Sequence, residues 1–123
     1  PASISQAAAT AALNGPQECV GEMLKAFRER HDYVVKALNQ LPGVECIESD
    51  GTFYAFPGFQ GAIEATPGVG NDQELAEHLL KESGVALVPG SAFGTPGHMR
   101  LSFATSMENL ENAMERLGKV LKA

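Results

Sequence analysis

The stretch that decides the fold runs from Gly84 to Ala104 and reads GVALVPGSAFGTPGHMRLSFA. It contains two apolar segments, Val85–Val88 and Met99–Phe103, separated by a loop made mostly of Gly, Pro, Ser and Thr. Short apolar runs bounded by such residues predict strands. One cation, Arg100, lies inside the second segment. An arginine at that point in a strand is the feature that needs an explanation.

The alternation of side chains along a strand gives Arg100 a predicted face. Successive side chains point to opposite faces of a sheet. Met99, Leu101 and Phe103 are therefore expected to face the helices. The opposite face is expected to carry His98, Arg100, Ser102 and Ala104. An arginine on that face is either simply solvated or binds an anion, because a guanidinium can hold a carboxylate through two parallel hydrogen bonds.

Two helices are predicted before the strands. Ser3 and Gln6 have the spacing of a capping box, which predicts a helix over about residues 4–13. Pro16 suits the first turn of a second, long helix that Pro42–Gly43 ends. Its apolar side chains recur at steps of three, four or seven, namely Val20, Met23, Leu24, Phe27, Val34, Leu38 and Leu41. We expect so long a helix to pack also against something beyond this domain.

The middle of the chain predicts strands and a connection. Val44–Glu48 and TFYAFPGF (residues 52–59) are expected strands on either side of the turn at Asp50–Gly51. Residues 60–71 hold three Gly and one Pro and are expected to form a flexible connection.

Two further helices are predicted toward the C-terminus. The first is capped by Asn71 or Asp72 and runs through Ser83, with an inner face of Leu75, Ala76, Leu79 and Leu80. The second begins at a capping box of Thr105 and Glu108 and runs to about Leu121, on Leu110, Ala113, Leu117 and Leu121.

This order of elements predicts the fold class α+β. Paired strands separated by helices indicate a two-layer α/β sandwich, a mostly antiparallel sheet with helices packed on one face. The 123 residues, 44% of them hydrophobic, suit a single domain over residues 1–123. The formal net charge of −6 argues against a nucleic-acid or anionic-membrane partner. No apolar run approaches the roughly 20 residues of a membrane span.

The remaining reactive side chains predict no nucleophile and no metal site. His31, His78 and His98 fall on three different elements. The five lysines lie on the solvated faces of the expected helices, where an amine keeps its proton. Cys19 and Cys46 are 27 positions apart and are expected to be separate reduced thiols, with a disulfide as the alternative. The residues therefore offer a binding arginine and no catalytic residue.

Several segments together resemble a known family. NGPQECVGEMLKAFRERHDYV, LPGVECIESDGTFYAFPGF and LLKESGVALVPGSAFGTPGHMRLSFA are similar to the C-terminal small domain of fold-type I, pyridoxal-phosphate-dependent class I/II aminotransferases. The group with bacterial-type aspartate aminotransferases is the nearest. The resemblance implies that Arg100 binds the α-carboxylate of the substrate. It also implies that Ser91, Ala92 and Phe93 line the substrate cleft.

The resemblance further implies what the chain lacks. In the family the Schiff-base lysine and most cofactor contacts lie in a large domain, and no Ser-x-x-Lys segment occurs here. We therefore expect this chain to be the small domain of a longer, cytoplasmic and homodimeric enzyme. By itself it is expected to be inactive and to bind little or no pyridoxal 5'-phosphate.

The substrates and one other class of function stay open at this point. The parent enzyme would act on amino acids and 2-oxo acids. Aspartate is favoured by its frequency in the family, and aromatic amino acids or alanine are alternatives. The alternative to an enzyme is a free-standing, non-catalytic module that binds small carboxylates or a protein partner.

Overall fold

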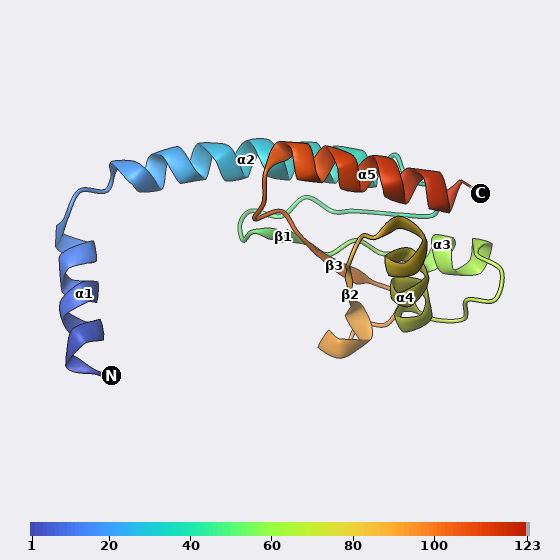
Figure 1. Ribbon diagram of the computed structural model, residues 1–123, viewed down its shortest axis with the longest axis horizontal. Coiled ribbons are helices and arrows are strands. Elements are labelled where there is room, and N and C mark those ends of the chain that lie inside the picture. The colour runs from blue at the N-terminus through green and yellow to red at the C-terminus, as the bar shows by residue number, and fades with distance from the viewer. Residues whose placement is uncertain (123) are drawn as a thin grey trace.

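The structure is a computed structural model that describes residues 1–122, and in these residues the chain forms five α-helices, one 3-10 helix and three short strands (Figure 1). In chain order they are α1 (Ser3–Asn14), α2 (Glu18–Leu38), β1 (Tyr54–Ala55), α3 (Gln60–Ala65), α4 (Asp72–Ser83), β2 (Val88–Pro89), η1 (Gly90–Phe93), β3 (Met99–Ser102) and α5 (Met107–Leu121). The predicted α+β class is confirmed.

The sheet is small and antiparallel, with β3 in its centre. The strand order is β1-β3-β2. Tyr54 pairs with Ser102 on one side of β3, and Val88 pairs with Arg100 on the other. β1 pairs with Leu101 and Ser102, and β2 pairs with Met99 and Arg100, so every residue of β3 has a paired neighbour on one side. Arg100 thereby lies on the central strand of the sheet.

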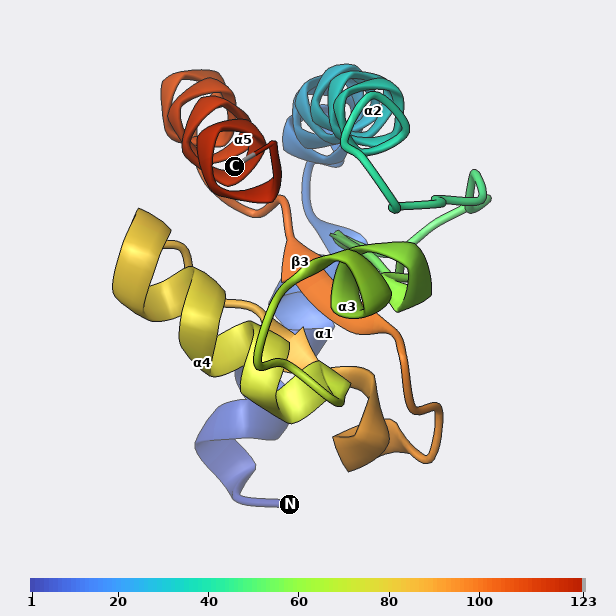
Figure 2. The ribbon, with the colours of Figure 1, turned by 90° about the vertical axis from the view of Figure 1, so that its right-hand side faces the viewer.

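The two faces of β3 differ as the alternation predicts. Met99, Leu101 and Phe103 are buried, whereas Arg100 is half-buried and Ser102 is exposed. The buried face packs under the helices, with the Phe103 ring 6.2 Å from that of Phe27 on α2. Helices α2 and α5 lie side by side, and α5 also contacts α4 (Figures 1 and 2). Burial of this apolar face is the main stabilising contribution to the domain.

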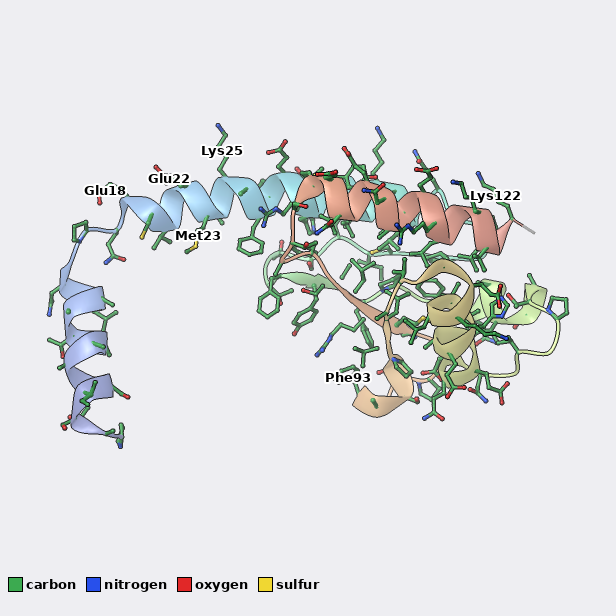
Figure 3. All side chains as sticks on the ribbon, viewed as in Figure 1. Glu18, Glu22, Met23, Lys25, Phe93 and Lys122 are labelled. Atoms are coloured by element: carbon green, nitrogen blue, oxygen red, sulfur yellow. The ribbon has the colours of Figure 1, made fainter. Side chains whose placement is uncertain are left out.

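The N-terminal part of the chain stands apart from this body (Figure 1). Helix α1 contributes no buried residue. In the first half of α2, Val20, Met23 and Leu24 are 50%, 55% and 64% exposed, whereas Val34 and Leu38 near its end are fully buried. Met23 projects from a part of α2 that no other element covers (Figure 3). The predicted apolar stripe is thus covered over only half of its length.

The strands are shorter than the sequence predicts, and one connection is not a loop. Val44–Glu48 makes only an isolated bridge, between Glu45 and Gly58. The expected strand Val85–Val88 is reduced to Val88–Pro89. Residues 60–71 were predicted to be a connection, but Gln60–Ala65 forms α3 because Ala62 and Ile63 bury an apolar side against the core.

Several helix ends also differ from the prediction. Ala2 precedes α1 and no side chain caps it, so the capping box at Ser3 and Gln6 is wrong. Helix α2 begins at Glu18 and not at Pro16, and it ends at Leu38. Ser106 caps α5, in place of Thr105, by accepting a hydrogen bond from the Asn109 amide.

Helix α4 agrees closely with its prediction. Asn71 caps it through a hydrogen bond from the Glu74 amide, and Gly84 ends it with a φ of 70°. One side chain differs, because Leu80 is 52% exposed and does not join the inner face. None of the helices within residues 1–122 combines the length and hydropathy needed to span a bilayer.

Candidate functional site

Arg100 is the centre of the candidate site. Its side chain extends from the face of β3 that the helices leave uncovered, and it is half-buried. Within residues 1–122 its guanidinium forms no ion pair and no side-chain hydrogen bond. A half-buried cation without an internal partner, in a chain of net charge −6, keeps all its donors available for an external anion.

Two aromatic rings flank the guanidinium. The Arg100 Cζ lies 4.8 Å from the centre of the Phe93 ring and 5.5 Å from that of the Tyr54 ring. Tyr54 belongs to β1, and Phe93 is the last residue of η1, the 3-10 helix that follows β2. A cation over an aromatic face is attracted by the quadrupole of the ring. This contact holds the guanidinium close to the sheet.

The loop from Pro89 to Gly97 is closed on itself at its base. The Gly90 amide donates to the carbonyl of His98 at 2.7 Å, and the Thr95 amide donates to the carbonyl of Gly90 at 3.0 Å. A side chain at Gly90 would collide with the backbone of Thr95 and His98. The loop therefore has a defined shape that depends on glycine at its first position.

A buried carboxylate anchors the same loop. Asp72, the first residue of α4, is 2% exposed, and its Oδ2 accepts a hydrogen bond of 2.7 Å from the Ser91 amide. Burial by itself would raise the pKa of Asp72, but hydrogen bonds led by that of the Ser91 amide lower the pKa below its ordinary value. The carboxylate is therefore held in its ionised form at neutral pH.

The structure shows a direct contact between two of the predicted site residues. Phe93 contacts Arg100, and it lies on η1 at the edge of the molecule (Figure 3). Ala92 is exposed beside it. Ser91 is half-buried, and its hydroxyl oxygen has no hydrogen-bond partner within residues 1–122.

Sequence reasoning missed two residues of this site. Tyr54 was assigned only to a strand, because nothing in the sequence indicates which strand lies beside β3. Asp72 was assigned only to a helix cap, because its partner Ser91 is 19 positions away. The available signal was the position of Asp72 inside the first turn of the helix, after the Asn71 cap.

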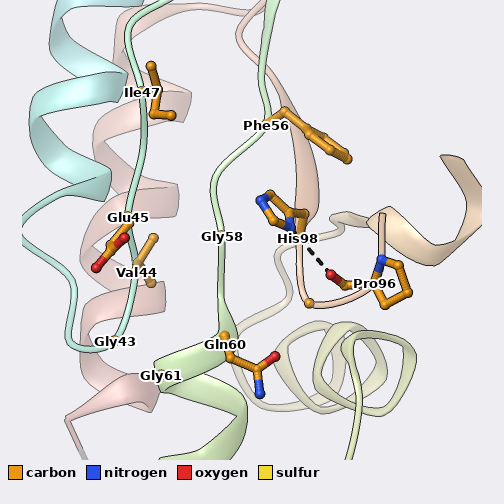
Figure 4. Close-up of a pocket in the computed structure, with 11 residues that line it drawn as sticks. Gly43, Val44, Glu45, Ile47, Phe56, Gly58, Gln60, Gly61, Pro96 and His98 are labelled. Atoms are coloured by element: carbon orange, nitrogen blue, oxygen red, sulfur yellow. Dashed lines mark hydrogen bonds between the residues drawn. The ribbon is translucent and has the colours of Figure 1, made fainter. Parts of the chain in front are cut away.

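A separate cavity lies beyond the aromatic residues. It has a volume of about 610 Å³, and its lining includes Glu45, Phe56, Gln60 and His98 (Figure 4). The Phe56 ring stacks on the His98 ring with 5.4 Å between ring centres. The centre of the Phe93 ring lies 6.0 Å from that of the Phe56 ring. Arg100 does not line this cavity. The Phe93 ring therefore links the two features, because it contacts both the guanidinium and Phe56 of the cavity lining.

The residues of this chain do not themselves fit pyridoxal phosphate. That cofactor needs a lysine amine held in an apolar site, and all five lysines are exposed, four on helices and Lys122 just after α5. Within residues 1–122 no group of three or more histidine, cysteine, aspartate or glutamate side chains could hold a metal ion. Arg100, whose N–H donors form no ion pair within residues 1–122, suits a small anionic ligand instead.

Comparison with known proteins agrees across nearly the whole chain. The profile of the family described as aminotransferase class I and II matches residues 2–117. An aspartate/prephenate aminotransferase of Nitrosomonas europaea is 47% identical over 130 residues, which cover 98% of this chain and 32% of that protein. An aspartate aminotransferase of Geobacillus stearothermophilus is 46% identical and covers 100% of this chain and 31% of its own length.

Solved structures agree with the same relationship. The aspartate aminotransferase of Rhizobium meliloti superposes with a TM-score of 0.90 at 41% identity over 99% of this chain and 32% of that one. An alanine aminotransferase of Pyrococcus furiosus gives a TM-score of 0.90 at 37% identity, over 99% of this chain and 30% of that one. The chain thus spans about a third of the length of the relatives it matches.

Proposed function

Because the chain belongs to the class I and II aminotransferases, we propose that it supplies the substrate-carboxylate-binding part of a pyridoxal-phosphate-dependent aminotransferase. Such an enzyme moves an amino group from an amino acid to a 2-oxo acid. The observation that carries the proposal is Arg100, a half-buried guanidinium on the central strand with no internal anion. The free-standing carboxylate-binding module is not favoured, since the family profile matches residues 2–117.

The proposed role of Arg100 is to bind and orient the α-carboxylate. Its planar fork donates two parallel hydrogen bonds to the two carboxylate oxygens, which fixes the direction of the substrate as well as its position. Because amino acids and 2-oxo acids share this carboxylate, one arginine serves both substrates. A strand that is hydrogen-bonded on both sides suits this task, since small displacements of a bound substrate are costly in rate.

The loop after β2 is proposed to form the rim of the substrate cleft. Ser91, Ala92 and Phe93 lie on η1, which the Asp72 carboxylate holds through the Ser91 amide. Ala92 and Phe93 are exposed, and Phe93 already contacts the guanidinium. A substrate bound to Arg100 would therefore meet these side chains first.

The cofactor chemistry is proposed to come from residues outside this chain. When bound in the enzyme, pyridoxal 5'-phosphate acts as the electron sink for the substrate carbanion. The exposed lysines of residues 1–122 do not suit its attachment. We therefore propose that a large domain holds the cofactor and that residues 1–123 alone have no transaminase activity.

Aspartate is the proposed amino-acid substrate. Both relatives compared above in sequence carry aspartate in their names. Alanine and aromatic amino acids are the alternatives, since a structural neighbour is an alanine aminotransferase and another is an aromatic aminotransferase.

The proposed partners are the large domain of the same enzyme and a second subunit, for which the uncovered half of α2 is available. The proposed location is the cytoplasm.

The test of this function is Arg100→Lys in the full-length enzyme. A lysine keeps the charge but loses the bidentate geometry. We expect kcat/KM for the amino acid to fall roughly 10- to 150-fold, since a hydrogen bond to a charged group contributes about 1.5–3 kcal/mol. Arg116→Lys on the exposed side of α5 is the matched control and should leave kcat/KM unchanged. An unchanged kcat/KM in Arg100→Lys would overturn the carboxylate role.

A further inference from the structure

The rings of Tyr54 and Phe93 do more than border the site. The Arg100 Cζ lies 5.5 Å from the centre of the Tyr54 ring and 4.8 Å from that of the Phe93 ring. We call these two rings the aromatic clamp. An arginine side chain has many rotamers, and an exposed one samples several of them. The Tyr54 ring on β1 and the Phe93 ring on η1 restrict this freedom. The guanidinium forms no ion pair within residues 1–122, so its N–H groups are left for a ligand.

Phe93 is itself held in place, although it is 49% exposed. Its ring meets the Phe56 ring edge to face, with 6.0 Å between centres. The turn that carries it ends at Gly94, which has a φ of 78° and donates its amide to the Ser91 carbonyl at 3.1 Å. An exposed phenylalanine with these supports is positioned by the fold. Its position is set by these contacts and not by exposure to solvent alone.

The support of this turn continues to the buried carboxylate of Asp72. No cation pairs with Asp72 among the described residues, so its burial is costly unless hydrogen bonds compensate. Its Oδ2 accepts the Ser91 amide at 2.7 Å, two residues before Phe93. The position at the start of α4 adds a favourable interaction with the helix dipole. The carboxylate thereby ties the body of the domain to the turn that carries Phe93.

Building on the proposed function, we propose that Phe93 is a positioning residue for Arg100 and that Asp72 maintains it by anchoring the turn. The clamp sets the direction of the guanidinium so that its N–H edge meets the substrate carboxylate. Because both rings belong to this chain, they can orient the guanidinium independently of the substrate. Loss of the Phe93 ring should therefore weaken substrate binding while leaving the chemical step largely intact.

The first test reads the clamp directly and needs no enzyme activity. In the ¹⁵N-labelled 123-residue chain, the Nε–Hε signal of Arg100 is identified by its loss in Arg100→Lys. A proton over a ring face is shifted upfield. We expect the Arg100 signal upfield of those of Arg28 and Arg116, for which no ring contact is recorded within residues 1–122. Phe93→Leu should move it downfield.

Two matched controls separate the clamp from a general disturbance of the fold. Phe27→Leu removes the ring that lies 5.4 Å from Arg30, so it should move the signal of Arg30 and not that of Arg100. Asp72→Asn should move the Arg100 signal part of the way toward its position in Phe93→Leu. Glu74→Gln neutralises another carboxylate of α4, which accepts the Gly70 amide at 2.7 Å, and should leave the Arg100 signal in place.

The second test is kinetic and uses the full-length enzyme. Phe93→Leu should raise KM for the amino acid roughly 2- to 30-fold with little change in kcat, the range expected from cation–π contacts. Phe93→Tyr keeps a ring face and should restore the wild-type KM. Phe27→Leu should leave KM unchanged.

The outcomes distinguish this inference from the proposed function. If Arg100→Lys impairs the enzyme but Phe93→Leu moves neither the Arg100 signal nor KM, the clamp is wrong and the carboxylate role stands. If Phe93→Leu moves the signal but Asp72→Asn does not, the role of Asp72 is overturned. If Arg100→Lys has no effect on kcat/KM, the proposed function fails, whatever the Arg100 signal shows.

Discussion

Asp72 accepts a hydrogen bond of 2.7 Å from the amide of Ser91, so the first residue of α4 is bonded to the loop that precedes the strand of Arg100. The two residues are 19 positions apart, and the contact joins the helical layer to the rim of the candidate site. It links the stability of the domain to the shape of the site. The dependence of the free energy of unfolding on pH should show the contribution of this hydrogen bond.

The pKa of Asp72 predicts a loss of stability in acid. Burial would raise this pKa, but the hydrogen bonds led by that of Ser91 lower it below the ordinary aspartate value of about 3.9. The ionised form is thus favoured in the folded state. Its contribution is fully present above about pH 4 and is lost as pH falls through the lowered pKa of the folded state.

Asp72→Asn should therefore flatten the acid limb of the stability profile. We expect the variant to lose less free energy of unfolding than the wild type between about pH 5 and pH 2, because its amide does not titrate. Urea denaturation at a series of pH values measures this. If the two proteins lose stability in parallel over that range, the hydrogen-bonded carboxylate does not contribute as described.

Gly43→Ala should destabilise the domain strongly. Gly43 has a φ of 69°, and a Cβ there would collide with the backbone of Gly61 and Ala62 at the start of α3. The left-handed conformation and the collision together should cost about 3 kcal/mol in free energy of unfolding. Gly51→Ala is the matched control, since a Cβ there would meet nothing within 4 Å. Equal unfolding midpoints of the two variants in urea would contradict this account.

The two cysteines should differ in reactivity. Cys19 is exposed, whereas Cys46 is buried and burial raises the pKa of its thiol. Titration of the native chain with a chromogenic disulfide reagent should modify one thiol quickly and the second only after denaturant is added. Cys19→Ser should remove the fast phase. Two fast thiols, or a fast phase that persists in Cys19→Ser, would show that Cys46 is accessible.

The uncovered part of α2 should make the 123-residue chain associate in solution. Val20, Met23 and Leu24 are all at least half exposed on one stretch of helix, and large exposed apolar patches promote association. Leu24→Asp should lower the association constant measured by sedimentation equilibrium. Leu80→Asp is the control, because Leu80 is 52% exposed on α4, away from this patch. Equal effects of the two substitutions would exclude α2 as the contact.

The sequence predicted the central features of the fold because they depend on local patterns. Alternation alone assigned Met99 and Leu101 to the buried face of β3 and Arg100 to the open one, as the structure confirms. Asn71 and Gly84 were recognised as the ends of α4 because caps and left-handed glycines act on adjacent backbone. These predictions needed no knowledge of distant contacts.

The predictions that failed depend on tertiary contacts. Residues 60–65 look like a loop because of Gly61, yet they form α3 since burial of Ala62 and Ile63 outweighs the glycine. Ser106 caps α5 one residue beyond the predicted Thr105, an offset that local propensity does not resolve. The strands are shorter because only a few residues of each meet β3.

The site was predicted in the same incomplete way. Arg100 was predicted from its strand and from the resemblance, and Phe93 from the resemblance. Tyr54 and Asp72 could not be predicted, because each reaches the site from an element distant in sequence. The strand order, which places β1 and β2 on either side of β3, could not be predicted from the sequence.

The most direct test of the central claim compares two ligands in two forms of the full-length enzyme. The ligands are the amino-acid substrate and the corresponding amine that lacks the α-carboxylate, and the proteins are the wild type and Arg100→Met. We predict that the wild type binds the amino acid roughly 10- to 150-fold more tightly than the amine and that Arg100→Met abolishes most of this difference. If the variant keeps the full preference for the amino acid in equilibrium binding, Arg100 does not bind the α-carboxylate.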